Sequence, residues 1–218
     1  MSGLSQKLLA EALGTGILVA TVVGSGIMAA KLSPESQAIA LLCNTLPTGA
    51  ILVVLISILG PVSGAHFNPV VSLVFAIRRQ LSMTSLGCYV VAQLIGACVG
   101  AMLANAMFDL SILQISTTAR SGSGIWLSEI VATFVLIGAI LGGQKNAPNA
   151  IPWLVGLTIV AAYWFTASTS FANPAVTIAR SLSNSFSGIA PGSLLGFMMA
   201  QLFGALLGLV VWGHLFKK

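Results

Sequence analysis

Long stretches without charge are the feature that most limits how this chain can fold. No Asp, Glu, Lys or Arg occurs in residues 36–77, 80–108, 146–179 or 181–216. Two further stretches, 8–30 and 121–144, each contain a single glutamate. A helix that crosses a bilayer needs about 20 predominantly apolar residues, and 57% of this chain is apolar. The sequence therefore predicts an all-α membrane protein.

The apolar stretches divide into six predicted spans, which lie near residues 8–30, 38–59, 83–107, 124–143, 150–168 and 191–215. An even number of spans puts both termini on one side of the membrane. The basic residues predicted on that side are Lys7, Arg78, Arg79, Lys145, Lys217 and Lys218. Lys31 and Arg120 fall on the other side. Because basic residues favour the cytoplasmic side, we expect cytoplasmic termini and a multi-pass protein of the inner (cytoplasmic) membrane.

The start of the chain and its net charge each allow another interpretation. A basic residue, Lys7, precedes an apolar run over 12–30, as in a signal peptide. That run is too long for a signal-peptide core, carries Glu11 and lacks a clear cleavage site before Lys31, so we expect a first span. The net charge of +5 comes from basic residues scattered at the ends of apolar segments. They indicate membrane topology, and no nucleic-acid partner is expected.

One apolar segment after the second span is too short to cross the membrane. Gly60-Pro61 interrupts the apolar pattern, small and polar residues follow, and a new apolar run from Pro69 reaches Arg78. A helix of roughly nine residues extends about 14 Å, half of a ~30 Å hydrocarbon core. The segment near 69–77 is therefore predicted to be a half-helix that enters the membrane and returns.

A matching segment follows the fifth span. Small and polar residues lead to Pro174, and a short apolar run then reaches Arg180, which predicts a second half-helix near 174–183. Irregular backbone at membrane depth is tolerated only where it lines a cavity or is buried in protein. Two such segments therefore predict a central cavity.

The chain also repeats itself. Ala92-Gln93-Leu94-Ile95-Gly96-Ala97 recurs as Ala200-Gln201-Leu202-Phe203-Gly204-Ala205, 108 residues later. Asn68 recurs as Asn173, 105 residues later. Three spans in each half make the second half inverted relative to the first. We predict one channel domain over 1–218, with a first repeat in 1–109 and a second in 110–218, whose half-helices meet near the midplane.

Each half-helix opens with a box of three residues, Asn68-Pro69-Val70 or Asn173-Pro174-Ala175. Asparagine is a strong N-cap and proline suits the first helical position, so one box alone would indicate only a capped helix. Two boxes at equivalent places of an inverted repeat indicate a shared function. Helix N-termini at the midplane supply positive potential, and the asparagine amides can donate to a passing oxygen. This arrangement favours neutral solutes over cations.

These residues resemble the major intrinsic protein (aquaporin) family. The resemblance covers nearly the whole chain: Ala10-Glu11-Ala12-Leu13-Gly14-Thr15-Gly16, Ser63-Gly64-Ala65-His66-Phe67-Asn68-Pro69-Val70, Ala92-Gln93, Glu129, Asn173-Pro174-Ala175 and Ala200-Gln201. It implies the aquaporin fold of six helices and two re-entrant half-helices, and a homotetramer in which each protomer has its own pore. No cofactor or metal is expected.

Two carboxylates and one histidine lie at predicted membrane depth. Glu11 and Glu129 are functional candidates because ionisable groups in a membrane are costly. Their symmetric placement favours a structural function, and the resemblance likewise implies that they accept hydrogen bonds from the backbone of the re-entrant loops. His66 is expected to brace the first loop rather than to gate the pore.

The resemblance also implies a selectivity filter on the extracellular side. Carrying the family's spacing over to this chain gives Thr48, Ala161, Ser170 and Val176. Water-selective members have an aromatic residue, a histidine and an arginine there, and Val176 takes the arginine's place. Loss of a guanidinium removes five donors and a full charge. We therefore expect a wide filter that admits water and larger neutral solutes such as glycerol-like polyols and metalloid hydroxides.

The segment 171–180, together with Thr48, resembles the bacterial aquaporin S type, which is associated with arsenical passage. This resemblance implies arsenous acid and related neutral or methylated arsenicals as candidate solutes. Arg180 lies four residues beyond Val176, on nearly the same helical face, and could reach back toward the filter. The alternative, which we favour, is that Arg180 satisfies loop carbonyls or faces the outer vestibule.

Other functions compete with a passive channel for small neutral solutes. A water-selective aquaporin is the main alternative. A secondary transporter also uses inverted repeats and broken helices, but the sequence places no unpaired carboxylate near Asn68 or Asn173 to carry a proton. An intramembrane enzyme would need a nucleophile or a metal cluster. His66 and His214 are far apart in the predicted topology, so no enzymatic activity is expected.

Overall fold

The computed structural model describes residues 3–217, and that part of the chain is helical without strands. Its long helices are α1 (Leu4–Leu32), α2 (Gln37–Ser63), α4 (Met83–Met107), α5 (Ser123–Asn146), α6 (Ile151–Phe165) and α8 (Leu194–Leu215). The 3₁₀ turn η1 (Pro148–Ala150) precedes α6, and η2 (Pro191–Ser193) precedes α8. Within the described residues, six helical segments are long and apolar enough to cross a membrane. The predicted all-α multi-pass fold is therefore confirmed.

Two short helices lie between the long ones, and both begin at the proline of a box. They are α3 (Pro69–Ile77) and α7 (Pro174–Arg180). The first agrees with its predicted limits, whereas the second ends at Arg180 rather than near 183. The chain leaves α7 in a tight turn in which the Ser181 amide donates to the Ile178 carbonyl. The residues that follow, Ser181-Leu182-Ser183-Asn184, are mostly small and polar, which is typical of a loop.

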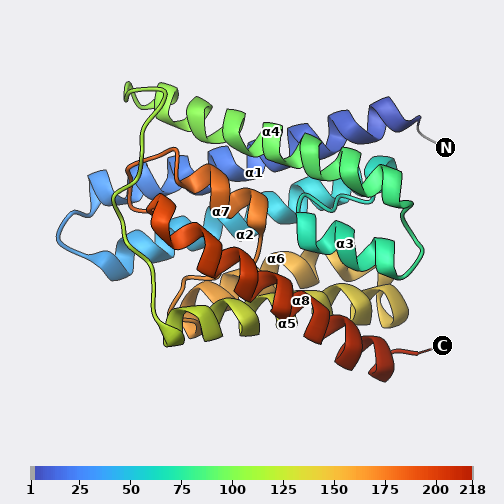
Figure 1. Ribbon diagram of the computed structural model, residues 1–218. Coiled ribbons are helices and arrows are strands. Elements are labelled where there is room, and N and C mark those ends of the chain that lie inside the picture. Colours follow the sequence, from blue (N-terminus) through green and yellow to red (C-terminus); the bar gives the residue numbers. More distant parts are fainter. Residues whose placement is uncertain (1–2, 218) are drawn as a thin grey trace.

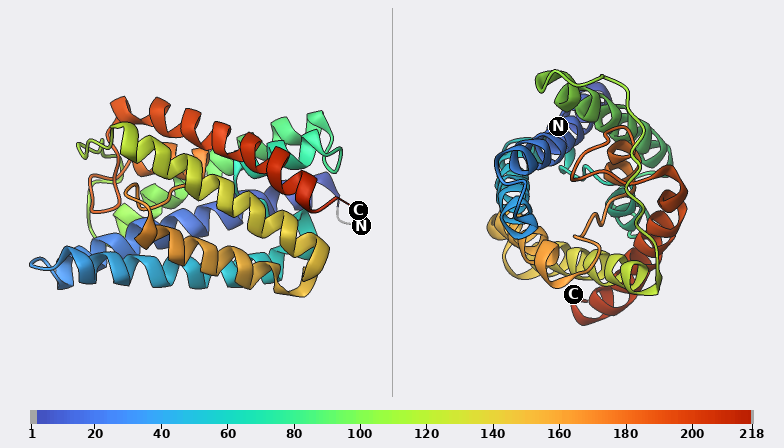
Figure 2. Two further views of the ribbon diagram at one scale, coloured as in Figure 1. Left: turned by 90° about the horizontal axis from the view of Figure 1, so that it is seen from below. Right: turned by 90° about the vertical axis from the view of Figure 1, so that its left-hand side faces the viewer.

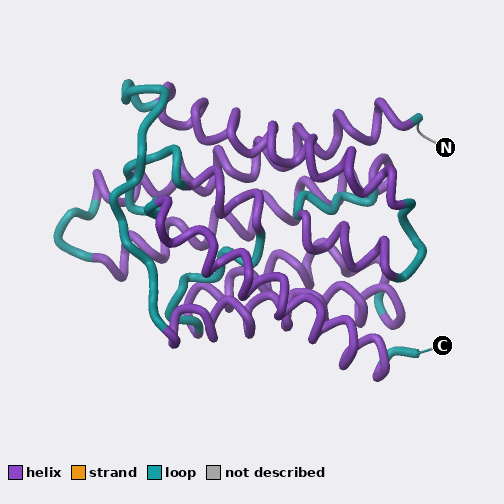
Figure 3. Tube along the Cα trace, viewed as in Figure 1, coloured by secondary structure: helices purple, strands orange, loops and turns teal. Residues whose placement is uncertain are grey.

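The long helices surround the half-helices and their loops. Both ends of the described chain lie at the same end of the bundle, with α3 toward that end and α7 toward the opposite end (Figure 1). Seen end-on, the long helices form a ring around the central segments (Figure 2). The loops that precede α3 and α7 run inside the bundle (Figure 3). Lys218, predicted on the cytoplasmic side, lies outside the described residues.

Glycines allow the closest helix crossings, and the two halves use them alike. A Cβ on Gly96 of α4 would clash with the Ala12 carbonyl of α1, and one on Gly204 of α8 would clash with the Ile130 carbonyl of α5. Small residues of this kind let helix backbones approach closely in membranes. The α1–α4 and α5–α8 pairs therefore hold the two halves in matching geometry.

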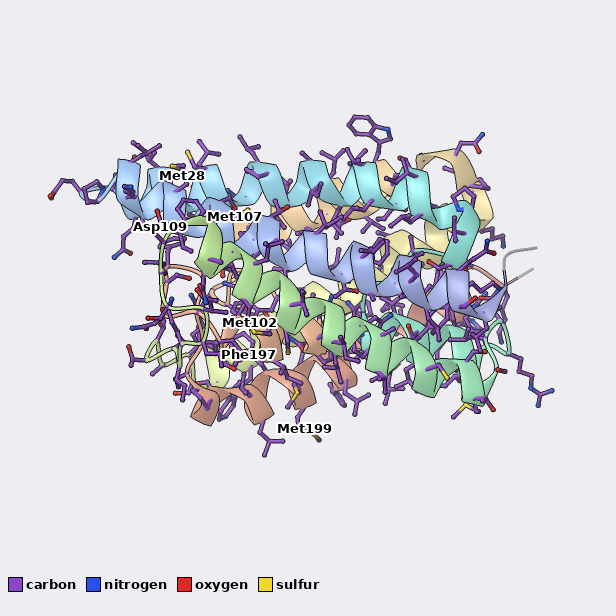
Figure 4. The ribbon with its side chains drawn as sticks, turned by 90° about the horizontal axis from the view of Figure 1, so that it is seen from above. Met28, Met102, Met107, Asp109, Phe197 and Met199 are labelled. Atoms are coloured by element: carbon purple, nitrogen blue, oxygen red, sulfur yellow. The ribbon has the colours of Figure 1, made fainter. Side chains whose placement is uncertain are left out.

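The outer surface of the bundle is apolar. Met28, Met107 and Met199 are all exposed, and Figure 4 shows Met28 and Met199 at the periphery. Phe197, on the same helix as Met199, is fully buried. An apolar periphery over long helices suits contact with lipid acyl chains.

Candidate pore

The two asparagines of the boxes cap the half-helices. Asn68 Oδ1 accepts a hydrogen bond from the Val70 amide at 3.1 Å, and Asn173 Oδ1 accepts one from the Ala175 amide at 3.0 Å. Pro69 and Pro174 occupy the first helical turn, where a missing N–H costs nothing. Both half-helix N-termini are therefore formed locally, as the sequence predicts.

The same asparagines also join the two loops. Asn68 Nδ2 donates to the Ala172 carbonyl at 2.7 Å, and Asn173 Nδ2 donates to the Phe67 carbonyl at 2.8 Å. Each bond connects residues more than 100 positions apart, so the N-termini of α3 and α7 meet inside the bundle. An asparagine amide has two N–H groups. These bonds use one N–H of each amide, and both asparagines line the central cavity.

Both loops contain strained backbone at matching positions. Phe67 and Ala172, which precede the asparagines, have φ of 50° and 48°, and Ala65 and Ser170 have φ of 51° and 47°. Residues with a side chain pay roughly 1–2 kcal/mol each in this left-handed region. Such strain persists only where surrounding contacts hold it, so both loops require strong anchors.

Glu11 is the anchor of the first loop. Its Oε1 accepts from the Ser63 hydroxyl at 2.7 Å and the His66 amide at 3.0 Å. Its Oε2 accepts from the Phe67 amide at 2.7 Å and Gln93 Nε2 at 2.8 Å. The carboxylate is fully buried, and charge-assisted hydrogen bonds of this kind are stronger than neutral ones. Both oxygens are occupied by donors that fix the loop.

Glu129 anchors the second loop in the same manner. Its Oε1 accepts from the Phe171 amide at 2.9 Å, and its Oε2 accepts from the Ala172 amide at 2.8 Å and from Gln201 Nε2 at 2.7 Å. The side chain is fully buried. Each loop is thus held by a carboxylate from the first long helix of its own half.

The two glutamines link each carboxylate to its half-helix. Gln93 Nε2 donates to Ser72 Oγ at 3.0 Å, and Gln201 Nε2 donates to Thr177 Oγ1 at 2.8 Å. Sequence reasoning used these glutamines only as markers of the repeat and missed both hydroxyls. The signal was available, because Ser72 and Thr177 are 105 residues apart, like the two asparagines.

His66 lies beside the inner part of the cavity. Its Nδ1 is 3.0 Å from Ser72 Oγ, and its ring centroid is 4.3 Å from that of Phe75. Both rings line the cavity. The imidazole thus packs between α3 and its loop and also contributes to the wall.

The central cavity has a volume of about 210 Å³ and is lined mainly by apolar side chains of both halves. Three of the four predicted filter residues, Thr48, Ser170 and Val176, lie in its wall. The Ser170 hydroxyl is buried without a hydrogen-bond partner in the described chain. The wall therefore combines an apolar surface with a few polar groups, as is usual in small-solute sites.

Ala161 is not in this wall, which corrects the filter set taken from the family spacing. It is exposed on the outside of α6, whereas Ile159 and Tyr163 of the same helix line the cavity. Two residues along an α-helix turn the side chain by about 200°, so Ala161 faces away when its neighbours two positions off face inward. The family spacing is counted back from Asn173 and assumes a fixed length for the loop between α6 and α7. In this chain the count reaches a residue on the outer face of α6.

Arg180 combines the two functions that the sequence left open. It is almost completely buried, its Nε donates to the Ser187 carbonyl, and its guanidinium carbon lies 3.4 Å from the centre of the Phe171 ring. It also lines the central cavity. The side chain therefore satisfies a loop carbonyl and belongs to the cavity wall at once.

Arg120 approaches the same ring from the loop between α4 and α5. Its guanidinium carbon lies 5.3 Å from the Phe171 centroid, its Nε donates to the Gly188 carbonyl at 2.8 Å, and its Nη2 donates to the Phe186 carbonyl at 3.1 Å. Burial lowers the pKa of this guanidinium, which remains cationic because arginine does not lose its proton in proteins. Sequence reasoning used Arg120 only as a topology signal.

Comparison with known proteins agrees with this geometry. Residues 2–163 match the family model described as major intrinsic protein. Aquaglyceroporin AqpS of Rhizobium meliloti (strain 1021) is 58% identical over 208 residues, which cover 95% of this chain and 89% of that protein. Aquaporin NIP2-1 of Oryza sativa subsp. japonica is 30% identical over 211 residues, covering 93% and 69%. The predicted similarity to the aquaporin S type is confirmed.

A solved structure shares the fold. The X-ray structure of the aquaglyceroporin from Plasmodium falciparum superposes with a TM-score of 0.74 over 99% of this chain and 96% of that one, at 19% sequence identity. At this identity the likeness shows the aquaporin fold and nothing about solutes. With the family match and the close relative, it shows that this chain belongs to the major intrinsic protein family, as a multi-pass membrane channel of the aquaglyceroporin group.

Proposed function

We propose that this chain is a passive channel for small neutral solutes, with a wide filter that passes glycerol-like polyols and metalloid hydroxides such as arsenous acid as well as water. The observation that carries the proposal is Val176 in the cavity wall, three residues after Asn173. An apolar side chain there supplies neither a charge nor a hydrogen-bond donor of its own. Thr48 and Ser170 supply hydroxyls in the same wall.

The chemistry of the wall suits solutes that carry hydroxyl groups and no net charge. Leu52, Val155 and Ile159 make much of the wall apolar, while the asparagine amides and the Ser170 hydroxyl offer a few polar contacts. A polyol or a metalloid hydroxide can turn its hydroxyls toward these groups. Aquaglyceroporin AqpS, the 58% identical relative, is by its name a channel of the glycerol-passing kind, which supports the same class of solute here.

The buried carboxylates support passive flow over coupled transport. Every oxygen of Glu11 and Glu129 accepts at least one hydrogen bond from a loop amide or a neighbouring side chain. A proton carrier must gain and lose its proton during transport, and that would break the anchors of the strained loops. We therefore assign these carboxylates to the scaffold.

Stopped-flow measurement of proteoliposomes tests the proposal directly. Vesicles containing the wild type are exposed to gradients of sucrose, glycerol and arsenous acid and compared with Val176→Arg. We expect the wild type to pass water, measured in the sucrose gradient, and also glycerol and arsenous acid. The arginine variant should lose at least tenfold in glycerol and arsenous acid flux while retaining water flux.

Val54→Arg, whose site is exposed on the outside of α2, tests the effect of adding an arginine elsewhere. Water flux alone in the wild type would contradict the proposal.

We also propose a homotetramer in the inner membrane, with cytoplasmic termini and with repeats in 1–109 and 110–218. The distribution of basic residues supports the orientation, and family membership supports the assembly. The mass of the detergent-solubilised complex tests the tetramer. The orientation is tested in cells with an impermeant thiol reagent, which should label Ser111→Cys but not Ser82→Cys.

A further inference from the structure

The two ends of the pore are built from equivalent positions of the repeat. Two residues before each box asparagine stand His66 and Phe171, and seven residues after it stand Phe75 and Arg180. The His66 and Phe75 centroids are 4.3 Å apart, and the Arg180 guanidinium lies 3.4 Å from the Phe171 centroid. All four side chains line the central cavity. The seventh position after the asparagine therefore contributes to the wall in both halves, and in the second half it is cationic.

Arg180 also marks where the central cavity ends. A second pocket of about 390 Å³ lies outside it, with Arg120, Trp164 and Asn44 among its lining residues. Among the described residues, Arg180 is the one that lines both this outer pocket and the central cavity. The Arg180 side chain is therefore in contact with both spaces.

The guanidinium retains unused hydrogen-bonding capacity. Nε donates to the Ser187 carbonyl, but Nη1 is buried without a hydrogen-bond partner in the described chain. An unsatisfied buried donor is costly, and more so when it is charged. A solute hydroxyl whose oxygen reaches Nη1 would satisfy it. Stacking over Phe171 and the bond to Ser187 fix the plane of the group, so the donor stays at the boundary.

We propose that Arg180 is the specificity-determining residue of the outer mouth. Its guanidinium restores, one helical turn beyond Val176, the fixed charge and donors that the filter position itself lacks. It donates to the hydroxyl oxygens of neutral solutes and repels cations, whereas Val176 keeps the channel wide further in. Arg120 is a positioning residue, because it holds the Phe186 and Gly188 carbonyls and lies over the same ring. This inference rests on the proposed channel function.

Two fluxes measured in the same proteoliposomes test the proposal. Glycerol flux is followed by light scattering, and proton flux is followed by a trapped pH-sensitive dye under a potassium diffusion potential. We expect Arg180→Met to raise the ratio of proton to glycerol flux at least tenfold, and Arg180→Lys to stay within threefold of the wild type. Arg78→Met removes an arginine from the end of the other half-helix and should leave the ratio unchanged. An unchanged ratio in Arg180→Met would overturn the proposal, whereas absent glycerol flux in the wild type would instead overturn the channel function.

A second measurement covers the case in which Arg180→Met does not assemble. Ala38, in the outer pocket, is replaced by cysteine in a background without Cys43, Cys88 and Cys98. Its rates of reaction with anionic and cationic methanethiosulfonates are compared with those at Ser111→Cys, on an exposed part of the α4–α5 loop. We expect the anionic-to-cationic rate ratio at Ala38→Cys to exceed that at Ser111→Cys tenfold, and to remain at least threefold higher when Arg120 is replaced by glutamine. Equal ratios at the two cysteines would refute the cationic mouth even if no Arg180 variant can be prepared.

Discussion

The inner and outer mouths of the pore use one framework with different side chains. In the first half, His66 lies against Phe75, and in the second half Phe171 lies against Arg180. The anchoring carboxylates, the strained loop residues and the asparagine cross-bonds match almost atom for atom between the halves. The comparison teaches that the repeat supplies the same rigid framework on both sides, while the two mouths differ in a few side chains.

Even the position three residues after the asparagine is alike in the two halves. Val71 and Val176 occupy it, and both line the cavity. The pore is therefore apolar on either side of the midplane at this level. The halves differ in charge at the seventh position after the asparagine, where Phe75 of the first half corresponds to Arg180 of the second.

The largest expected effect comes from removing an anchor in either half. Glu11→Leu leaves the His66 and Phe67 amides unsatisfied, and Glu129→Leu does the same to two amides of the second loop. A buried group that loses its partner costs about 1–3 kcal/mol, and the strained backbone loses its support. We expect both variants to lose most glycerol flux and to unfold at clearly lower temperature in detergent.

The exposed Glu35 provides the control for this comparison. Glu35→Leu should melt and conduct like the wild type. If only one of the two buried variants were destabilised, the halves would not share their anchoring mechanism.

Overpacking a helix crossing should have a moderate effect. Gly96→Ala and Gly204→Ala each push a methyl group into a backbone carbonyl of the facing helix. Overpacking typically costs about 1–3 kcal/mol, so both variants should show a lower melting temperature by a similar amount. A Cβ at Gly87, also in α4, meets no atom within 4 Å. Gly87→Ala should therefore raise stability slightly, by about 0.5–1 kcal/mol, and a fall there would contradict the packing argument.

The smallest expected effect comes from making the inner mouth resemble the outer one. His66→Phe reproduces the residue found at Phe171 and removes the hydrogen bond between Nδ1 and Ser72. Ser72 still accepts from Gln93, so the loss should be about 1 kcal/mol of unfolding free energy. Thermal unfolding and the ratio of water to glycerol flux measure the outcome. A large change in that ratio would show that His66 acts on the solute as well as on the loop.

Most of the framework could be predicted from the sequence because its causes are local. Apolar length and missing charge identify the spans, and each asparagine and proline specify the start of a half-helix. The glutamates were expected at the loops because they stand at equivalent places in the two halves. The repeat could also have identified Ser72 and Thr177 as equivalent hydroxyls, because they are 105 residues apart, like the two box asparagines.

Positions that depend on the rotation of a helix were harder to predict. Ala161 was placed in the filter by counting back from Asn173, yet it faces outward and Tyr163 lines the cavity. One residue more or less in the connecting loop turns a helix by about 100°. Arg180 was open to two interpretations for a similar reason, since its side chain can extend toward either the loop or the cavity.

The sequence by itself determined that this chain spans a membrane, folds as an inverted repeat and brings two capped half-helices together. Those features follow from apolar length, charge placement and N-cap chemistry, which act over a few residues. Only the tertiary structure decided that the two asparagines bond across the midplane to Phe67 and Ala172, that Ala161 faces away from the cavity, and that Arg180 stands where two cavities meet. These outcomes depend on contacts between residues far apart in the chain, and such contacts exist only once the helices have packed.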